Sequence, residues 1–255
     1  MAQRRQINKH TNGWQPRAVA YSPTEGSIFS TAVDELLHLL AQYPGSSLAF
    51  NQYRDTHPEL DRPDGAEIRC RNLCCYLESF GQHTGVQSVL VGEAAGYAGC
   101  RFSGIPFTGE AQLAGPDRLS WTGGHELPRS STADRPWAER SAKMVWETLG
   151  ERRDCVLWNA FPWHPFGPSG PLSNRPPGRD LHHGHQVLEC FLALYPDSQP
   201  YAIGRVAQRT LMAIGVDAPY IRHPSRGGKA KFVAGVTALA PQTGDSLSMI
   251  SRDSS

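Results

Sequence analysis

The chain has 255 residues, and its 25 Lys and Arg against 24 Asp and Glu give a formal net charge of +1. Hydrophobic residues make up 39% and charged residues 19%, a balance that excludes an intrinsically disordered chain and a highly charged tail protein. No apolar stretch approaches the roughly 18 to 20 residues that cross a bilayer, and the basic start up to Arg17 has no apolar signal-peptide region. We therefore expect a soluble, cytoplasmic, monomeric protein with no membrane contact, which would bind any polyanion through local charge.

Helical and strand patterns alternate along the chain. Apolar residues recur at helical spacing over 30–42, a second helix is predicted over 63–83, and the apolar run 88–91 predicts a buried strand that ends at Gly92. The same alternation continues beyond this point. Further helices are predicted at 132–149, 181–194, 205–214 and 228–239, and further strands at 155–158, 201–203 and 220–221. Such alternation predicts a three-layer α/β/α fold with a short, mostly parallel central sheet, which binds its ligands at the carboxyl ends of the strands.

The apolar part of the chain favours one domain. We assign 28–241 to a single α/β domain, preceded by an N-terminal extension over 1–27 and followed by a flexible tail over 242–255.

Cysteine and histidine groups do not predict a metal or cofactor. The six cysteines, at positions 70, 74, 75, 100, 155 and 190, are too few and too irregular for a disulfide framework, so reduced thiols are expected. Cys70 and Cys74 share a helix face, which favours a core role over metal ligation. His182, His183 and His185 could bind zinc, but no acid or cysteine stands near them at a useful spacing, so a structural or solvated role is favoured.

Three polar motifs follow predicted strands. The first runs from Gly92 to Phe107 with Glu93 just beyond its strand, the second places Asn159 after 155–158, and the third is His223-Pro224-Ser225. Each motif alone is more often structural. Together they would bring a carboxylate, an amide, an aromatic ring and an imidazole to one edge of the sheet, a set suited to a planar heterocycle with polar edges. His164 could also enter this pocket from the loop after Asn159.

At these residues the sequence resembles the uracil-DNA glycosylase superfamily. Its members carry Gly-Glu-Ala-Pro-Gly or Gly-Met-Asn-Pro-Gly, then Gly-x-Pro-Phe, a strand ending in Asn, and His-Pro-Ser. This chain has, in that order, Gly92-Glu93-Ala94-Ala95-Gly96, Gly104-Ile105-Pro106-Phe107, Asn159 and His223-Pro224-Ser225. The spacing from Gly92 to Phe107 resembles the single-strand-selective monofunctional branch. The Glu93-Ala94 pair resembles the thermostable iron–sulfur branch, whose cysteine pattern is absent, so we expect no cluster.

The resemblance implies a base-excision enzyme that flips uracil out of DNA and hydrolyses its N-glycosidic bond. Glu93 would orient the attacking water and offset cationic charge on the sugar, and His223 would donate a hydrogen bond to uracil O2 as negative charge develops there. Phe107 would stack on the base, Asn159 would bond to uracil O4 and N3–H, and Ala94 would offer its backbone N–H. Since no lysine stands in the motifs, the enzyme is expected to be monofunctional.

Three residues depart from the family pattern. Ala94 replaces the Asp or Asn of several branches, which leaves water handling to Glu93 alone, and Ala95 replaces the usual proline, so we expect a looser loop. Gly96 stands where some branches place a tyrosine against uracil C5, and Tyr97 follows one residue later. We assign Gly96 and Tyr97 to the C5 side and leave the exclusion of thymine open.

DNA contact is expected beside the third motif. Between residues 201 and 231 the chain has six basic residues and one acid, a local charge of 6 − 1 = +5. The residues assigned to DNA contact are Ser225, Arg226, Gly227, Gly228 and Lys229. Arg226 stands where family members insert a wedge into the base stack, so an arginine would fill the gap left by the flipped base.

The expected partners are single- or double-stranded DNA containing uracil, and free uracil as product. Two alternatives stay open: a protein that binds uracil or damaged DNA without turnover, and a glycosylase for deaminated purines. Strand preference, the range of bases and inhibition by the abasic product cannot be predicted from the sequence.

Overall fold

Four parallel strands form the centre of the molecule. The computed structural model describes residues 28–81, 85–114 and 119–239, so the predicted extension and tail lie outside the described residues. The strands are β2 (Ser88–Ala94), β3 (Cys155–Phe161), β5 (Gln199–Ile203) and β6 (Tyr220–Ile221). Their order is β3-β2-β5-β6, and every neighbouring pair is parallel. All four carboxyl ends therefore lie at the same edge of the sheet.

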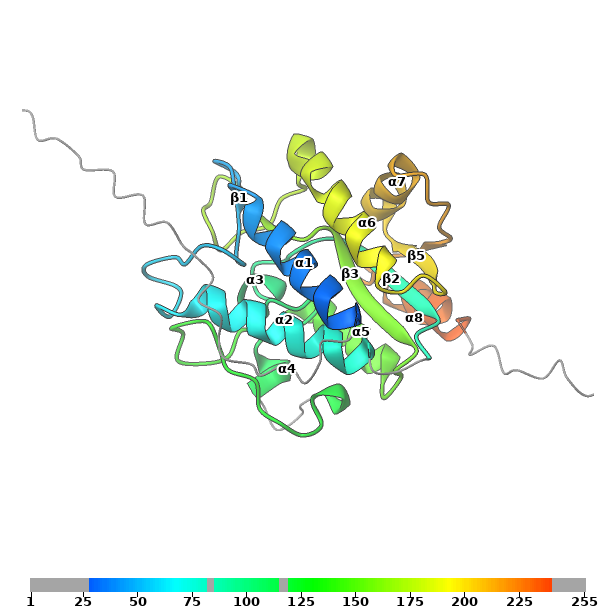
Figure 1. Ribbon diagram of the computed structural model, residues 1–255, viewed down its shortest axis with the longest axis horizontal. Coiled ribbons are helices and arrows are strands. Elements are labelled where there is room, and N and C mark those ends of the chain that lie inside the picture. Colours follow the sequence, from blue (N-terminus) through cyan, green and yellow to red (C-terminus); the bar gives the residue numbers. More distant parts are fainter. Residues whose placement is uncertain (1–27, 82–84, 115–118, 240–255) are drawn as a thin grey trace, which may run out of the picture.

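Helices cover both faces of this sheet (Figure 1). One face carries α1 (Ile28–Gln42), α2 (Gly65–Gly81) and α6 (His185–Ala193), and the other carries α5 (Arg140–Leu149) and α8 (Lys229–Thr237). Helix α7 (Arg205–Ala213) packs against β2, β3 and β5. The predicted three-layer α/β/α architecture around a parallel sheet is confirmed.

Two contacts from β3 show how the layers are fixed together. The Trp158 ring stacks on Phe191 of α6, with 4.1 Å between ring centroids. The backbone N–H of Leu157 donates to the Tyr76 hydroxyl of α2 at 2.7 Å. All these side chains are buried, as expected for a parallel sheet covered by helices on both sides.

Several short elements were not predicted from the sequence. Strands β1 (Ala49–Phe50) and β4 (His164–Pro165) form an antiparallel pair, in which Phe50 lies opposite His164. The remaining elements are α3 (Cys100–Ser103), α4 (Ala111–Ala114), and the 3₁₀ helices η1 (Ser120–Thr122) and η2 (Gly178–Gly184). Strands of two residues and single helical turns are too short to leave a periodic pattern.

Some predicted boundaries were wrong. β2 and β3 continue to Ala94 and Phe161, so Glu93 and Asn159 lie within strands rather than beyond them. The predicted helix over 132–149 begins only at Arg140, because Pro136 cannot donate its nitrogen inside a helix. The region predicted as one helix over 181–194 starts as η2 before α6. The predicted helix end at 83 lies outside the described residues.

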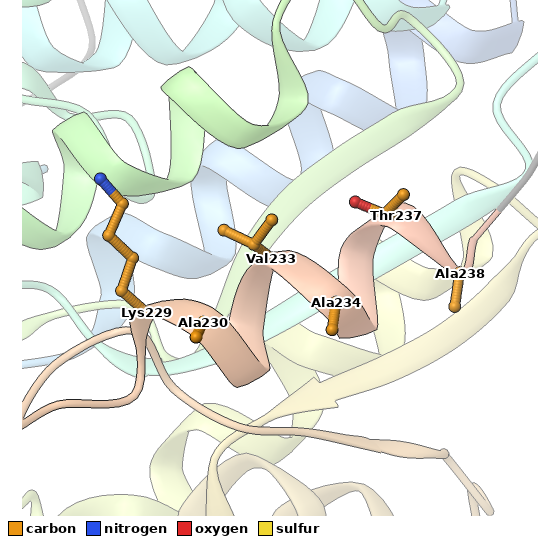
Figure 2. A pocket seen from close by; sticks show the side chains of 6 residues that line it. All are labelled: Lys229, Ala230, Val233, Ala234, Thr237 and Ala238. Atoms are coloured by element: carbon orange, nitrogen blue, oxygen red, sulfur yellow. The ribbon is translucent and has the colours of Figure 1, made fainter.

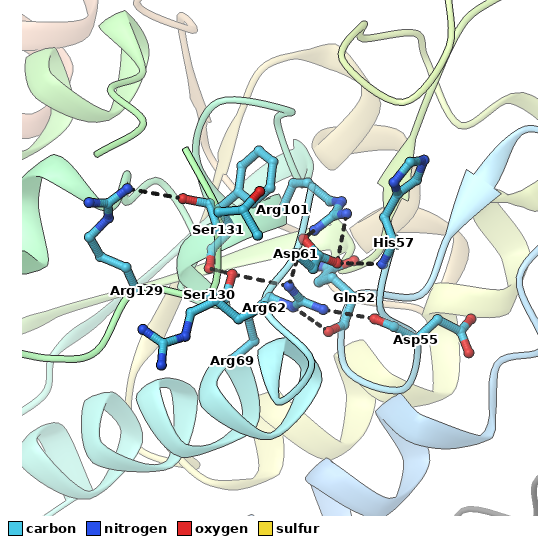
Figure 3. A network of polar contacts seen from close by, with 12 residues as sticks. Gln52, Asp55, His57, Asp61, Arg62, Arg69, Arg101, Arg129, Ser130 and Ser131 are labelled. Carbon is cyan, nitrogen blue, oxygen red and sulfur yellow. Dashed lines mark hydrogen bonds and ion pairs between the residues drawn. The ribbon is translucent and has the colours of Figure 1, made fainter. Parts of the chain in front are cut away.

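A buried ion-pair network fixes the segment after β2 to its surroundings (Figure 3). Both terminal guanidinium nitrogens of Arg101, on α3, contact the Asp61 carboxylate at 3.0 Å, and Arg69 of α2 approaches it at 3.3 Å. These three side chains have no solvent exposure. The network therefore ties α3, which lies within the first motif, to α2.

No helix among residues 28–81, 85–114 and 119–239 is both long enough and apolar enough to span a bilayer.

Candidate active site

The three motifs meet at the carboxyl edge of the sheet. Gly92 lies opposite Asn159 in the β2–β3 register, and a Cβ built on Gly92 would lie 2.2 Å from Phe107 Cζ and 3.0 Å from Asn159 Oδ1. Phe107 has a φ of +52°, an uncommon value for a residue with a side chain. Its ring centroid lies 6.2 Å from that of His223. Four motif residues therefore share one small region, and only glycine fits at position 92.

Asn159 presents an unused donor in this region. Its side chain is 2% exposed, yet Nδ2 has no hydrogen-bond partner. A buried polar group without a partner costs about 1–3 kcal/mol, so such groups in native proteins usually have a reason. A bound molecule that offers an acceptor to Nδ2 and a donor to Oδ1 would satisfy this amide.

Glu93 lies half-buried in β2, directly after Gly92. Burial raises the pKa of its carboxyl above the ordinary value, while the positive charges of Arg209 and Arg226 oppose the rise. Arg209 comes from α7 and Arg226 from the loop after His223. The positive charges of these two arginines therefore favour the ionised form of the half-buried carboxyl.

His223 has a defined tautomer. The backbone N–H of Ser225 donates to His223 Nδ1 at 3.2 Å, and the Ser225 hydroxyl lies 2.8 Å from the same atom. Since Nδ1 accepts, the proton of the neutral ring is on Nε2. Burial and the nearby charge of Arg222 lower the pKa of His223 to about 4. At neutral pH this imidazole is uncharged and offers one N–H donor.

The turn after β2 is packed against the segment before α5. Ala94, the last residue of the strand, pairs with Phe161. A Cβ on Gly96 would meet the Glu139 carboxylate at 2.7 Å, and the Tyr97 ring contacts Trp137 edge-on at 6.1 Å. On the predicted C5 side, Glu139 therefore occupies the space that a side chain at 96 would need. Sequence reasoning missed Glu139, because it placed that residue inside a helix.

The loop predicted to contact DNA turns tightly after His223. Arg226 and Gly227 are exposed and have φ values of +50° and +74°. A Cβ on Gly228 would lie 2.0 Å from the His223 carbonyl oxygen, so glycine is needed for the chain to pass there. Lys229 Nζ lies 3.6 Å from a Glu147 carboxylate oxygen. As described above, the Ser225 hydroxyl is directed at His223.

His164 contacts the backbone of the first motif. Its Nδ1 lies 2.9 Å from the Ala95 carbonyl oxygen and its Nε2 lies 2.9 Å from that of Pro171. Both ring nitrogens therefore contact backbone groups of the protein, so the suggestion that His164 enters the pocket was wrong. The suggestion was based on the position of His164, five residues after Asn159 in the sequence.

The cysteines and histidines do not form a metal site in the described part of the chain. The thiols are free, and burial raises the pKa of Cys70 to about 11 and that of Cys74 to about 12. The His182 and His183 rings lie 3.9 Å apart, but among residues 28–81, 85–114 and 119–239 no three His, Cys, Asp or Glu side chains are grouped as metal ligands would be.

A separate depression of about 820 Å³ lies along α8 (Figure 2). It is lined by Lys229, Ala230, Val233, Ala234, Thr237 and Ala238. This lining includes none of the residues that surround Gly92.

Comparison with known proteins supports the fold. The chain matches no protein-family model and no curated protein. Among solved structures it is similar to wild-type SMUG2 from Pedobacter heparinus, with a TM-score of 0.54 over 82% of this chain and 97% of that one. The sequence identity is 14%, so the similarity shows the fold alone. The chain thus shares the fold of that protein, with helices on both faces of a parallel sheet.

Proposed function

We propose that this chain is a monofunctional DNA glycosylase that hydrolyses the N-glycosidic bond of uracil flipped out of DNA. The observation that carries the proposal is the buried amide of Asn159, whose Nδ2 lacks a partner while its Oδ1 lies beside Gly92 and the Phe107 ring. Uracil offers an acceptor at O4 next to a donor at N3. This pair complements an amide that donates from Nδ2 and accepts at Oδ1.

The same amide disfavours cytosine. Cytosine carries an amine where uracil has O4 and a lone pair at N3, so each Asn159 atom would face a group of its own kind. A site with buried polar groups strongly rejects a molecule that leaves these groups unpaired. The resulting discrimination between two substrates is roughly 10⁴-fold, far more than an apolar pocket achieves between molecules of different size. Phe107 would stack on the base, a contact that every base can make.

Bond cleavage requires charge stabilisation at both ends of the breaking bond. As C1′–N1 breaks, its electron pair moves to uracil and positive charge develops on the sugar. The neutral His223 ring donates its Nε2–H to O2, and backbone N–H groups near Ala94 add donors there. Glu93 orients the water whose oxygen bonds to C1′, and its negative charge offsets that of the sugar. The water proton leaves to solvent or to the uracil anion.

The DNA backbone would lie on the exposed loop after His223. Arg226 is its exposed cation and would enter the gap left by the flipped base, with Gly227 offering its backbone N–H to a phosphate. Ser225 acts instead through His223, and Lys229 would have to leave Glu147 to reach DNA.

A panel of single- and double-stranded oligonucleotides tests this function. Each carries one uracil, cytosine, thymine, hypoxanthine or xanthine, and base release is measured under single-turnover conditions. We expect uracil release, little or no cytosine release, and loss of uracil release in Asn159→Ala. Release of hypoxanthine or xanthine without uracil would replace uracil by deaminated purines as the substrate. Tight binding of uracil-containing DNA with no release of any base would show a binding protein.

A further inference from the structure

His164 is the one buried histidine whose ring nitrogens both face carbonyl oxygens in the described part of the chain. Its side chain has no solvent exposure. The ring lies between the Ala95 and Pro171 carbonyl oxygens, at 2.9 Å from each. Its own backbone N–H donates to Gln52 Oε1 at 3.1 Å, and Gln52 Nε2 donates to the Pro162 carbonyl at 2.8 Å. Gln52 therefore fixes the backbone of His164, and the two carbonyl groups fix its ring.

A neutral imidazole has one N–H, so it can donate to only one of these two carbonyl groups. Ala95 is 1% exposed, whereas Pro171 is half-buried, so its carbonyl can be solvated by water. A buried acceptor without a donor is costly, and a partly solvated one is not. The proton of the neutral ring therefore belongs on Nδ1, bonded to Ala95. Burial and the charge of Arg101 keep the ring neutral by lowering its pKa to about 4.

The Ala95 carbonyl lies directly after the end of β2. β2 ends at Ala94, so Ala95 is the first residue after the sheet pairing that fixes Gly92 and Ala94. Two residues later, the backbone N–H of Tyr97 donates to Asn174 Oδ1 at 2.9 Å. The turn after β2, within the first motif, is thus held on one side by the segment 164–174, through His164 and Asn174.

We propose that His164 is a positioning residue: its Nδ1–H fixes the Ala95 peptide group and thereby the turn after β2 with the backbone N–H donors near Ala94. This inference rests on the proposed glycosylase function. It assigns His164 no contact with DNA or uracil. A change of about 1 Å in such a site can cost about 10²-fold in rate, which is the scale expected here.

Two substitutions separate the contacts of the ring. In His164→Asn the amide nitrogen takes the place of Nδ1 and can still donate to Ala95, whereas in His164→Gln it takes the place of Nε2 and can reach only Pro171. Single-turnover uracil release at saturating DNA, KM and the thermal unfolding midpoint are measured for both. His38→Asn, an exposed histidine on α1, is the control.

We expect His164→Asn to retain the rate to within about tenfold and His164→Gln to lose about 10²-fold, with KM and the unfolding midpoint similar in the two variants. Equal rates in the two variants, or rates that only follow their unfolding midpoints, would overturn the inference. If neither variant folds, ¹⁵N NMR of the wild-type ring decides: a protonated Nδ1 supports the inference and a protonated Nε2 refutes it. Absence of uracil release by the wild type would instead refute the proposed function, a result distinct from equal rates in an active enzyme.

Discussion

Asp61 gives a sharp test of how the first motif is supported. Its carboxylate accepts two hydrogen bonds from Arg101 at 3.0 Å and one from the His57 backbone at 2.8 Å, and it lies 3.3 Å from Arg69. In Asp61→Asn the charge is lost and an NH₂ group faces guanidinium donors, which leaves two buried arginines uncompensated. Removing one partner of a buried pair costs about 3–5 kcal/mol. For a domain of this size, that loss lowers the thermal midpoint by roughly 6–20 °C.

The measurement is thermal and urea unfolding at neutral pH, with Asp64→Asn as a matched control. The Arg62–Asp64 pair is 3.5 Å long with side chains 55% and 48% exposed, so its loss should change stability by no more than about 0.5 kcal/mol. A cost for Asp61→Asn within about 1 kcal/mol of the control would refute the reasoning, because the network would then be no stronger than a surface pair.

Three further predictions concern the site. Arg209→Gln removes a charge that opposes the raised pKa of Glu93, so the acid limb of the pH–rate profile for uracil release should move to higher pH. Gly92→Ala should displace Phe107, since the added Cβ would lie 2.2 Å from its ring, and should abolish uracil release while the chain still folds by circular dichroism. The pKa of His164 falls from 6.5 to about 4 on folding, so the unfolded chain binds more protons between these values. Stability should therefore fall as pH drops through this window, by up to about 3 kcal/mol from this residue, and His164→Asn should remove that part of the slope.

Each of these predictions has its own control and contrary outcome. Arg205→Gln removes a charge from the same helix that is not among those named as shifting the pKa of Glu93, so its acid limb should stay at the wild-type position. Equal movement in both variants would mean a general charge effect. Gly85→Ala adds a Cβ that meets nothing within 4 Å and should keep full activity. Full activity in Gly92→Ala as well would exclude the tight packing around position 92. An unchanged pH slope in His164→Asn would mean that the ring is charged in the folded chain.

Strands and helices with long apolar patterns could be predicted from the sequence. The continuation of a strand through polar residues could not. The runs at 88–91 and 155–158 gave β2 and β3, but the strands continue through Glu93 and Asn159 because backbone pairing does not depend on side-chain polarity. Trp137 fits a helical pattern from 132, yet its ring stacks on Phe102 at 5.1 Å in a segment without regular secondary structure that contains Pro136.

The motifs of the candidate site could be predicted from the sequence. The contacts that hold these motifs in place could not. Gly92, Phe107, Asn159 and His223 come together because parallel strands share one carboxyl edge, which alternation of strands and helices already implies. The contact of Arg101 with Asp61, forty residues apart, leaves no periodic signal. Contacts of this kind join residues far apart in the sequence and depend on how the folded elements pack against one another.

The most direct test of the account is the rate of uracil release by the wild type and by Glu93→Gln. Both proteins are incubated in excess with a uracil-containing oligonucleotide, and free uracil is measured over time. We expect release by the wild type and a loss of about 10²–10⁴-fold in the variant, which keeps the shape of the side chain but removes its charge. Equal rates in the two proteins would contradict the role of Glu93, and no release by the wild type would contradict the glycosylase itself.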